Sequence, residues 1–390
     1  MTDDLEAHAL AEDNDIALWR RHIHAHPELG YEEELTSAFV ADKLRGFGLE
    51  VTTGWAKTGV VGVLHGGRGS GRVIALRADM DALPMDEHND FAHVSTHKGR
   101  MHACGHDGHT AMLLGAARDL AADPDFAGTV AFIFQPAEEA LGGAKMMIDE
   151  GVLERYGVEE VYGLHNWPQL PAGSIGVRAG PVMASCDFFR ITLKGKGGHA
   201  AMPHLNNDPV VAAAQLVTAL QTLVSRNVAP HEAAVVSVTQ IHAGSADNVI
   251  PPDAELRGTA RAFSAETRAL IERRIGEIAN GIGAAMSMEV VYKYVRGFPA
   301  TVNAEAEAGH AARAAAAVVG AENVRRFEPP SMTAEDFAFM LEARPGCYIW
   351  LGQGTPDGQM LHHPQYDFND AVIPVGVAWW KALVRDRLEA

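Results

Sequence analysis

Residues 102–109, His-Ala-Cys-Gly-His-Asp-Gly-His, gather a thiol, an acid and three imidazoles in one short stretch. Cys104 and His106 are two residues apart, so both side chains can reach one ion. Thiolate and neutral imidazole are preferred ligands of zinc and related divalent metals. No Cys-x-x-Cys pair occurs, which argues against a closed structural zinc site. The stretch therefore predicts a catalytic metal site around Cys104 and His106.

Further candidate ligands lie elsewhere in the chain, at Glu138, Glu139, His165, His362 and His363. Two adjacent carboxylates suit a division of labour, because one can bind metal while the other moves a proton between water and a leaving amine. A catalytic zinc needs three protein ligands and a water, so the surplus favours two ions with a bridging ligand such as Cys104. Only one residue of the doublet His362–His363 need be a ligand, and the doublet alone does not say which.

Each candidate also has a purely structural interpretation. Glu138 and Glu139 could form a solvated acidic turn, and His165 could be a hydrogen-bonded core histidine. Their shared placement after apolar strands favours a functional role. In contrast, the histidines at 22, 24 and 26 are expected to mark a helix end stopped by Pro27. The glycine-rich stretch 194–199 lacks the Gly-Lys-Ser/Thr ending of a phosphate loop.

The elements around these residues place them at one edge of a sheet. Apolar runs at 73–76, 129–134 and 161–164 predict strands that end just before 77–79, 135–139 and 165–167, and a helix is expected over 110–122. Continuous apolar strands separated by helices indicate an α/β fold with a mostly parallel sheet covered on both faces. Ligands bind at the carboxyl ends of such strands. We also expect a helix over the first 40 residues, strands at 60–64 and 347–351, and a terminal helix over 372–388.

The middle of the chain follows a different pattern. Strands are expected at 188–193, 234–241, 254–263 and 289–295, and helices at 208–225 and 265–286. The order β-α-β-β-α-β is ferredoxin-like. We therefore predict a catalytic domain formed by residues 1–183 and 297–390, with an inserted α+β domain at 184–296.

Composition excludes several classes of partner. A chain of 390 residues is long enough for two domains. The formal charge of -18 argues against nucleic acid and anionic membrane surfaces as partners. No stretch approaches a membrane span, and the acidic N-terminus lacks a signal-peptide pattern. Three cysteines offer no disulfide framework, which is consistent with a cytoplasmic location.

Nine motifs in order resemble one family over nearly the whole chain: RRHIHAHPELGYEE, RADMDALP, MHACGHDGHTAMLLGAA, FQPAEE, GLHNWP, GKGGHAAMPH, DNVIPP, TAEDFAFM and LHHPQYDFND. This is the co-catalytic metallopeptidase and amidohydrolase family that contains hippurate hydrolases, aminoacylases and plant auxin-conjugate hydrolases. The resemblance implies hydrolysis of the amide bond of a small N-acyl amino acid. Relatives closer to the dipeptidases have a metal-binding His where this chain has Arg77, and Cys104 is expected to compensate.

The resemblance also implies a role for each matching residue. It makes Glu138 the general acid/base and resolves the histidine doublet in favour of His363. It makes the inserted domain a lid and a dimerisation surface, in a homodimer or a larger homo-oligomer. His199 would polarise the scissile carbonyl, Asn248 and Arg261 would bind the substrate carboxylate, and Asp79 would orient ligands. Two divalent ions, zinc, manganese, cobalt or nickel, would be held by Cys104 as a bridge, His106, Glu139, His165 and His363.

Two other functions remain open from the sequence. One is a dipeptidase or carboxypeptidase activity within the same family. The other is a non-catalytic metal-binding or ligand-binding protein on the same scaffold, against which the pair Glu138–Glu139 argues because a binding protein needs no base.

Overall fold

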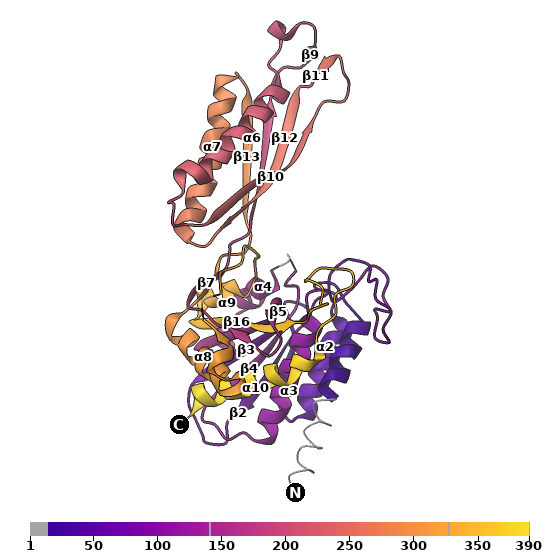
Figure 1. Ribbon diagram of the computed structural model, residues 1–390, viewed down its shortest axis with the longest axis vertical. Helices are drawn as coiled ribbons and strands as arrows, with labels where there is room; N and C mark the ends of the chain where they lie inside the picture. The colour runs from indigo at the N-terminus through magenta and orange to yellow at the C-terminus, as the bar shows by residue number, and fades with distance from the viewer. Residues whose placement is uncertain (1–14, 140–141, 327, 390) are drawn as a thin grey trace. The chain divides into compact units, whose positions relative to one another are not determined.

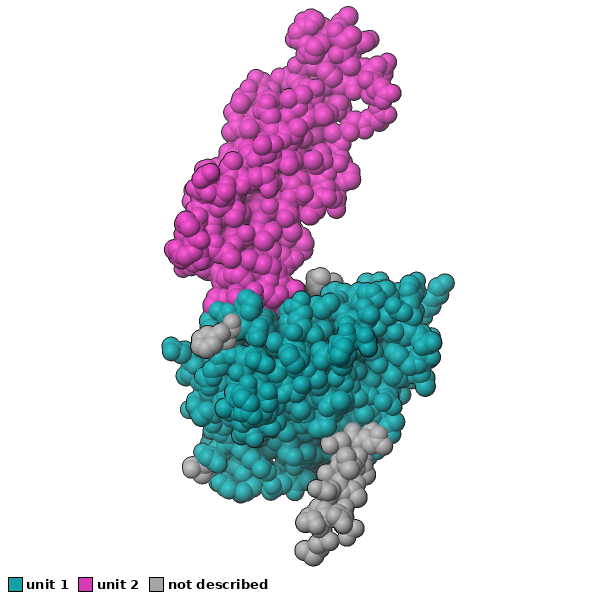
Figure 2. Space-filling view, in the orientation of Figure 1, with its two compact units in different colours: residues 1–180, 302–329, 336–390 teal, residues 181–301, 330–335 magenta. Residues whose placement is uncertain are grey.

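The computed structural model describes residues 15–139, 142–326 and 328–389. The chain divides into two compact units (Figures 1 and 2). Unit 1 comprises residues 1–180, 302–329 and 336–390, and unit 2 comprises residues 181–301 and 330–335. Each unit has a hydrophobic core of its own, as expected when layers of secondary structure pack together within each unit.

Unit 1 is built on an eight-stranded sheet with the order β1-β2-β4-β3-β5-β16-β6-β15. The central strands β4, β3, β5 and β16 are parallel, whereas β1, β2 and β4 pair antiparallel. The predicted α/β fold with a mostly parallel sheet is confirmed at this centre. The strands are β1 Glu50–Trp55, β2 Gly59–His65, β3 Val73–Asp79, β4 Thr129–Gln135, β5 Glu160–Pro171, β6 Ile175–Gly176, β15 Val324–Arg325 and β16 Gly346–Gly354.

Helices bury the main core of unit 1 against this sheet (Figure 1). β3 and β4 are buried along almost their whole length, which explains why both read as continuous apolar runs. The helices that share this core are α2 Glu34–Gly46, α3 His106–Ala122, α8 Glu305–Val319 and α10 Ile373–Leu388. Three shorter helices also belong to unit 1: α4 Gly143–Asp149, α5 Val152–Tyr156 and α9 Ala338–Ala343.

Two details of unit 1 differ from the sequence prediction. The first 40 residues do not form one helix: residues 15–25 are helical, the chain then extends past Pro27, and α2 begins at Glu34. Proline cannot continue the helix, and Leu29 instead makes a bridge to Ala82. Residues 1–14, which carry part of that prediction and the predicted absence of a signal peptide, lie outside the described residues.

The second difference concerns β5, which is longer than predicted. β5 continues to Pro171, so His165 lies inside the strand and not after its end. The pairing of β5 with β3 ends at Gly163, but its pairing with β16 continues and sets His165 opposite Trp350. His165 thus lies beyond the part of β5 that pairs with β3, near the level of Asp79 at the end of β3.

Unit 2 is an antiparallel four-stranded sheet with the order β10-β12-β8-β13. Along the chain its elements follow the predicted β-α-β-β-α-β order. Two helices, capped by the side chains of Asp208 and Ser264, pack side by side against one face of the sheet (Figure 1). The elements are β8 Asp187–Lys194, α6 Pro209–Asn227, β10 Ala234–Ala243, β12 Asp253–Ala262, α7 Ala265–Ala285 and β13 Glu289–Arg296.

A small separate sheet in unit 2 pairs β9 Gly198–His199 with β11 Val249–Ile250. Among the described residues of the whole chain, no helix combines the length and the apolar character that a membrane crossing needs.

Candidate metal centre

Cys104 and His106 stand at the start of α3, which begins at His106. Gly105 between them has φ 99°, a left-handed conformation that side chains other than glycine rarely adopt. A Cβ atom at Gly105 would lie 2.3 Å from Asn166 Oδ1. The glycine therefore lets the turn approach β5 closely and brings Cys104 to His165, which lies on that strand.

The ring orientation of two imidazoles is set by backbone acceptors. Nδ1–H of His106 donates to the carbonyl oxygen of Asp81 at 2.8 Å, and Nδ1–H of His165 donates to that of Asn166 at 2.7 Å. Both rings thus keep the Nε2 lone pair for another partner. Nε2 of His165 lies 3.4 Å from Cys104 Sγ. Nε2 of His106 is buried and has no hydrogen-bond partner within the described chain.

The two histidines of the doublet have different partners in the structure. His362 directs Nε2 to within 3.4 Å of Cys104 Sγ and 3.5 Å of Glu139 Oε1. Its φ of 63° is left-handed, a strained conformation for a residue other than glycine that often accompanies a functional site. His363 Nδ1 instead accepts a hydrogen bond from the backbone of Gln365 at 3.1 Å. The geometry therefore favours His362 over His363, the residue taken from the family resemblance.

The two glutamates are held by one carboxylate. Asp81 Oδ1 accepts the backbone N–H of Glu138 at 3.0 Å, and Asp81 Oδ2 accepts that of Glu139 at 2.9 Å. Ala137, directly before them, has φ 56° and turns the chain sharply after β4. Because Asp81 also supplies the carbonyl that orients His106, it joins three candidate residues of the site. The family resemblance implies a supporting role for Asp79 but not for Asp81, although Asp79 ends β3 and Asp81 lies two residues beyond it.

Donor atoms meet in overlapping groups whose members lie within 4.8 Å of one another. One group joins Cys104, His106 and His165, and a second joins Cys104, Glu139 and His362. Nε2 of His106 and Oε1 of Glu139 are both buried without a hydrogen bond in the described chain. A buried polar atom without a hydrogen bond is rare unless water or an ion satisfies it. The thiolate, imidazole and carboxylate donors therefore fit divalent metal ions, and Cys104 belongs to both groups.

The charges of this cluster are balanced by protons when no cation is present. Burial and the Glu139 carboxylate raise the pKa of Cys104 above its usual value. Burial alone would lower the pKa of His106, but Asp79 and Cys104 raise it well above its usual value. Cys104 and then Glu139 raise the pKa of His362 to about 10. A bound cation would replace these protons, because ligation requires thiolate and neutral imidazole.

A buried ion network lies beneath the cluster. Arg77 donates through Nη1 to Asp79 Oδ2 at 2.7 Å and through Nη2 to Asp336 Oδ1 at 3.0 Å. Nδ1–H of His109 donates to the other oxygen of Asp79 at 2.6 Å. Arg77 thus pairs with two carboxylates. Asp336 also accepts the backbone N–H of Ala144, so the network ties the TAEDFAFM motif to β3 and α4.

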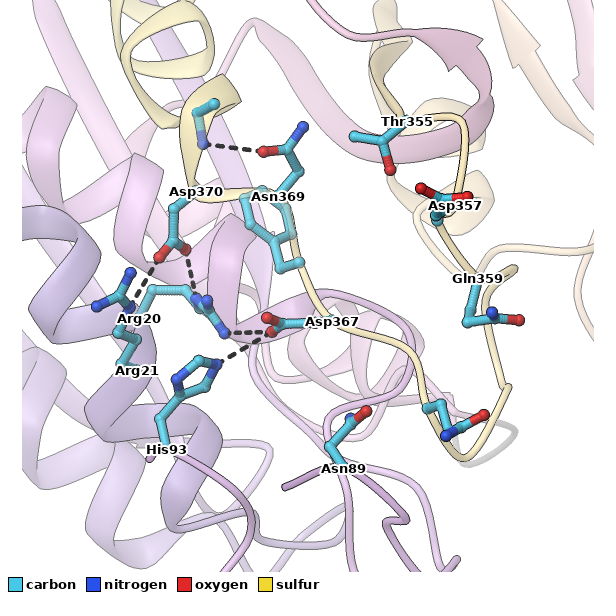
Figure 3. A pocket seen from close by; sticks show the side chains of 14 residues that line it. Arg20, Arg21, Asn89, His93, Thr355, Asp357, Gln359, Asp367, Asn369 and Asp370 are labelled. Atoms are coloured by element: carbon cyan, nitrogen blue, oxygen red, sulfur yellow. Dashed lines mark hydrogen bonds and ion pairs between the residues drawn. The ribbon is translucent and has the colours of Figure 1, made fainter. Parts of the chain in front are cut away.

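A second network braces the other side of α3. His24 is fully buried and donates from Nδ1 to Asp107 Oδ2 at 2.8 Å and from Nε2 to Glu87 Oε1 at 3.1 Å. Arg20 lies 3.5 Å from Asp107 and pairs with Asp367 and Asp370, as Figure 3 shows. Asp367 and Asp370 border a hollow of about 580 Å³, and the charged groups that line this hollow largely neutralise one another. His24 therefore holds α3 in place, and no metal role is needed to explain it.

The remaining candidate residues belong to unit 2. The strand pair β9–β11 sets His199 opposite Val249, and the carbonyl of Asn248 accepts the N–H of Ala200 at 3.0 Å. His199 and Asn248 are thus neighbours, and both are exposed. Arg261 is separate from them, on β12, half-buried on the sheet face away from the helices.

Comparisons with known proteins identify relatives of this chain. The model of the peptidase family M20/M25/M40 matches residues 75–386. An N-acetyl-L-cysteine deacetylase of Bacillus subtilis is 42% identical over 91% of this chain and 83% of its own. A hippurate hydrolase of Campylobacter jejuni is 41% identical over 93% of this chain and 94% of its own.

A solved structure extends the similarity to the fold. A dinuclear metal-binding peptidase of Bacillus subtilis from the M20 family is 36% identical, with a TM-score of 0.86 over 97% of this chain and 99% of that one. The family predicted from the nine motifs is confirmed. The chain belongs to the peptidase family M20/M25/M40.

Proposed function

We propose that the protein hydrolyses the amide bond of N-acyl amino acids to a carboxylic acid and a free amino acid. The observation that carries this proposal is the pairing of Glu138 with the Cys104-centred donor cluster through Asp81. A catalytic base beside a metal-ligand cluster suits metal-assisted hydrolysis. The deacetylase and hippurate hydrolase at about 40% identity support the choice of substrate class.

The proposed ligands of two divalent ions are Cys104 as the bridge, His106, Glu139, His165 and His362. His362 replaces His363 in this set because of its contacts with Cys104 and Glu139. Zinc, manganese, cobalt and nickel all suit a donor set of this kind. When bound, the ions would polarise the substrate carbonyl and lower the pKa of water enough for a carboxylate base to suffice at neutral pH.

Glu138 would carry the proton in both halves of the reaction. Its carboxylate takes a proton from the attacking water and then delivers it to the departing nitrogen, so that an amine leaves and not an amide anion. The Glu138 side chain is only 7% exposed, which limits proton exchange with bulk solvent. Asp81 and the turn at Ala137 would keep its position relative to Glu139 constant during the transfer.

Unit 2 would supply substrate contacts. We assign His199 to the stabilisation of the oxyanion, and Asn248 and Arg261 to the free carboxylate of the substrate. The unit itself would act as a lid and as a dimerisation surface. The three free cysteines of the chain suit the reducing cytoplasm, where we place the enzyme. Light scattering coupled to gel filtration tests the dimer, and a monomeric mass would remove that part of the proposal.

The deciding experiment measures amino-acid release from hippurate and from N-acetyl amino acids, with a dipeptide panel in parallel. The protein is first treated with a chelator and then supplied with Mn²⁺, Zn²⁺, Co²⁺ or Ni²⁺. We expect release from the N-acyl substrates to disappear on chelation and to return with one or more metals. Release from dipeptides alone would make the protein a peptidase. No release from either panel, with metal bound, would favour a binding protein.

A further inference from the structure

The open face of the unit 2 sheet carries three cations in one row. Antiparallel pairing sets Lys293 of β13 opposite Arg190 of β8, and Arg190 opposite Arg257 of β12. All three side chains are exposed and lie on the face away from α6 and α7, because the alternate residues of these strands form the core. Directly opposed like charges destabilise a sheet. A row of three therefore calls for a compensating interaction.

The charge of the row is only partly neutralised within the chain. Glu255 is the carboxylate that pairs with both Arg190 and Arg257, each through Nε at 2.7 Å. Lys293 has no carboxylate partner in the described part of the chain, and neither has Arg261 farther along β12. Next to the row, Glu255 is thus the carboxylate set against four cations, whereas Asp253 and Glu289 lie farther along the same face, where Glu289 pairs with Lys194. The whole chain, in contrast, carries a formal charge of -18.

The row also borders a hollow of about 520 Å³, within the usual size of small-molecule sites. Phe188 and Val295, 50% and 61% exposed, lie next to the row and leave apolar surface on the same face. Arg261 lines the hollow four residues beyond Arg257, which corresponds to roughly 13 Å along an extended strand. The hollow therefore offers strong positive charge at the row and an aromatic ring beside it.

We propose that this hollow binds a small organic dianion, with its phosphate-like or paired carboxylate group on Lys293, Arg190 and Arg257 and its apolar part on Phe188. Guanidinium groups bind such oxygens through paired, charge-assisted hydrogen bonds. The proposed contacts are made by Lys293, Arg190, Arg257 and Phe188, none of which has a part in the proposed reaction, whereas Arg261, farther along β12, is the residue of the hollow that is also proposed to bind the substrate carboxylate. Binding and catalysis can therefore fail independently.

The test is calorimetric titration of the full-length, metal-loaded protein with phenylphosphonate and with inorganic phosphate, at a pH where both are dianions. We expect phenylphosphonate to bind more tightly, and F188A to remove that advantage. The double variant R190Q/R257Q should bind phenylphosphonate roughly tenfold more weakly, which corresponds to about 1.4 kcal/mol.

A matched control lies on α7 of the same unit. Arg273 and Arg274 also share one carboxylate, that of Glu277, so R273Q/R274Q makes the same change in charge away from the hollow. We expect this control to bind phenylphosphonate as the unmodified protein does. Equal weakening in both double variants, or unchanged binding in R190Q/R257Q, would overturn the proposal. So would binding that vanishes when metal is removed, because it would place the anion at the metal cluster.

Discussion

Nε2 of His362 lies 3.4 Å from Cys104 Sγ, although 258 positions separate the two residues in the chain. The contact brings a residue from the C-terminal part of the chain into the donor cluster. It also distinguishes His362 from His363, whose Nδ1 accepts a backbone hydrogen bond from Gln365.

The first prediction follows from that contact. We expect His362→Ala to lower the metal content of the purified protein and its activity together, because the variant loses a donor atom beside Cys104 and Glu139. His363→Ala is the matched control and should retain its metal. Elemental analysis by mass spectrometry measures both. Metal loss in the His363 variant alone would restore the assignment made from the family resemblance.

The second prediction concerns the proposed base. Glu138→Gln should keep the fold and the bound metal, because the amide is isosteric and Glu138 is not one of the proposed ligands. Turnover should fall by roughly 100-fold or more, as expected when a general base is removed. Steady-state kinetics and metal analysis on the same sample separate the two effects. Near-normal turnover would show that another group moves the proton.

The third prediction concerns the buried Arg77. Arg77→Met would leave Asp79 and Asp336 buried without their guanidinium partner, and breaking such a network typically costs about 3–5 kcal/mol of stability. Urea unfolding measures the change. Arg45→Met, which removes an exposed pair with Asp42, should cost less than about 1 kcal/mol. Similar small losses in both variants would mean that the network contributes little to stability.

The fourth prediction is a pH dependence of stability. Burial opposes the charged form of His24, but Asp107 and Glu87 raise its pKa to about 9, above the value of about 6.5 expected in the unfolded chain. The stabilisation is therefore complete below about pH 6.5 and is lost as the pH rises through about 9, with a total on the order of 3 kcal/mol.

Unfolding of the unmodified protein and of His24→Gln at several pH values between 6 and 10 tests this dependence. The variant should be less stable at the low end of this range, and its stability should fall less steeply towards the high end. Parallel curves for the two proteins would exclude His24 as the cause.

Much of the fold was accessible from residue patterns. Buried parallel strands are apolar on both faces, so 73–76 and 129–134 were recognisable as β3 and β4. β1 was missed because its residues are exposed or half-buried and form no apolar run. The single helix predicted over the first 40 residues was wrong beyond residue 25, because its apolar periodicity ends at Ile23 and Pro27 does not continue the helix. The extent of β5 depends on its pairing with β16, a partner almost 200 residues away.

For the candidate site, the sequence by itself determined which residue types are available and the family to which they belong. Cys104, His106, Glu138, Glu139 and His165 were identifiable because each stands next to a recognisable strand or helix. The tertiary structure alone decided how Asp81, Arg77 and Asp336 connect them, and which histidine of the doublet turns towards Cys104. These contacts are hydrogen bonds between segments far apart in the chain, and such contacts cannot be predicted from local sequence patterns.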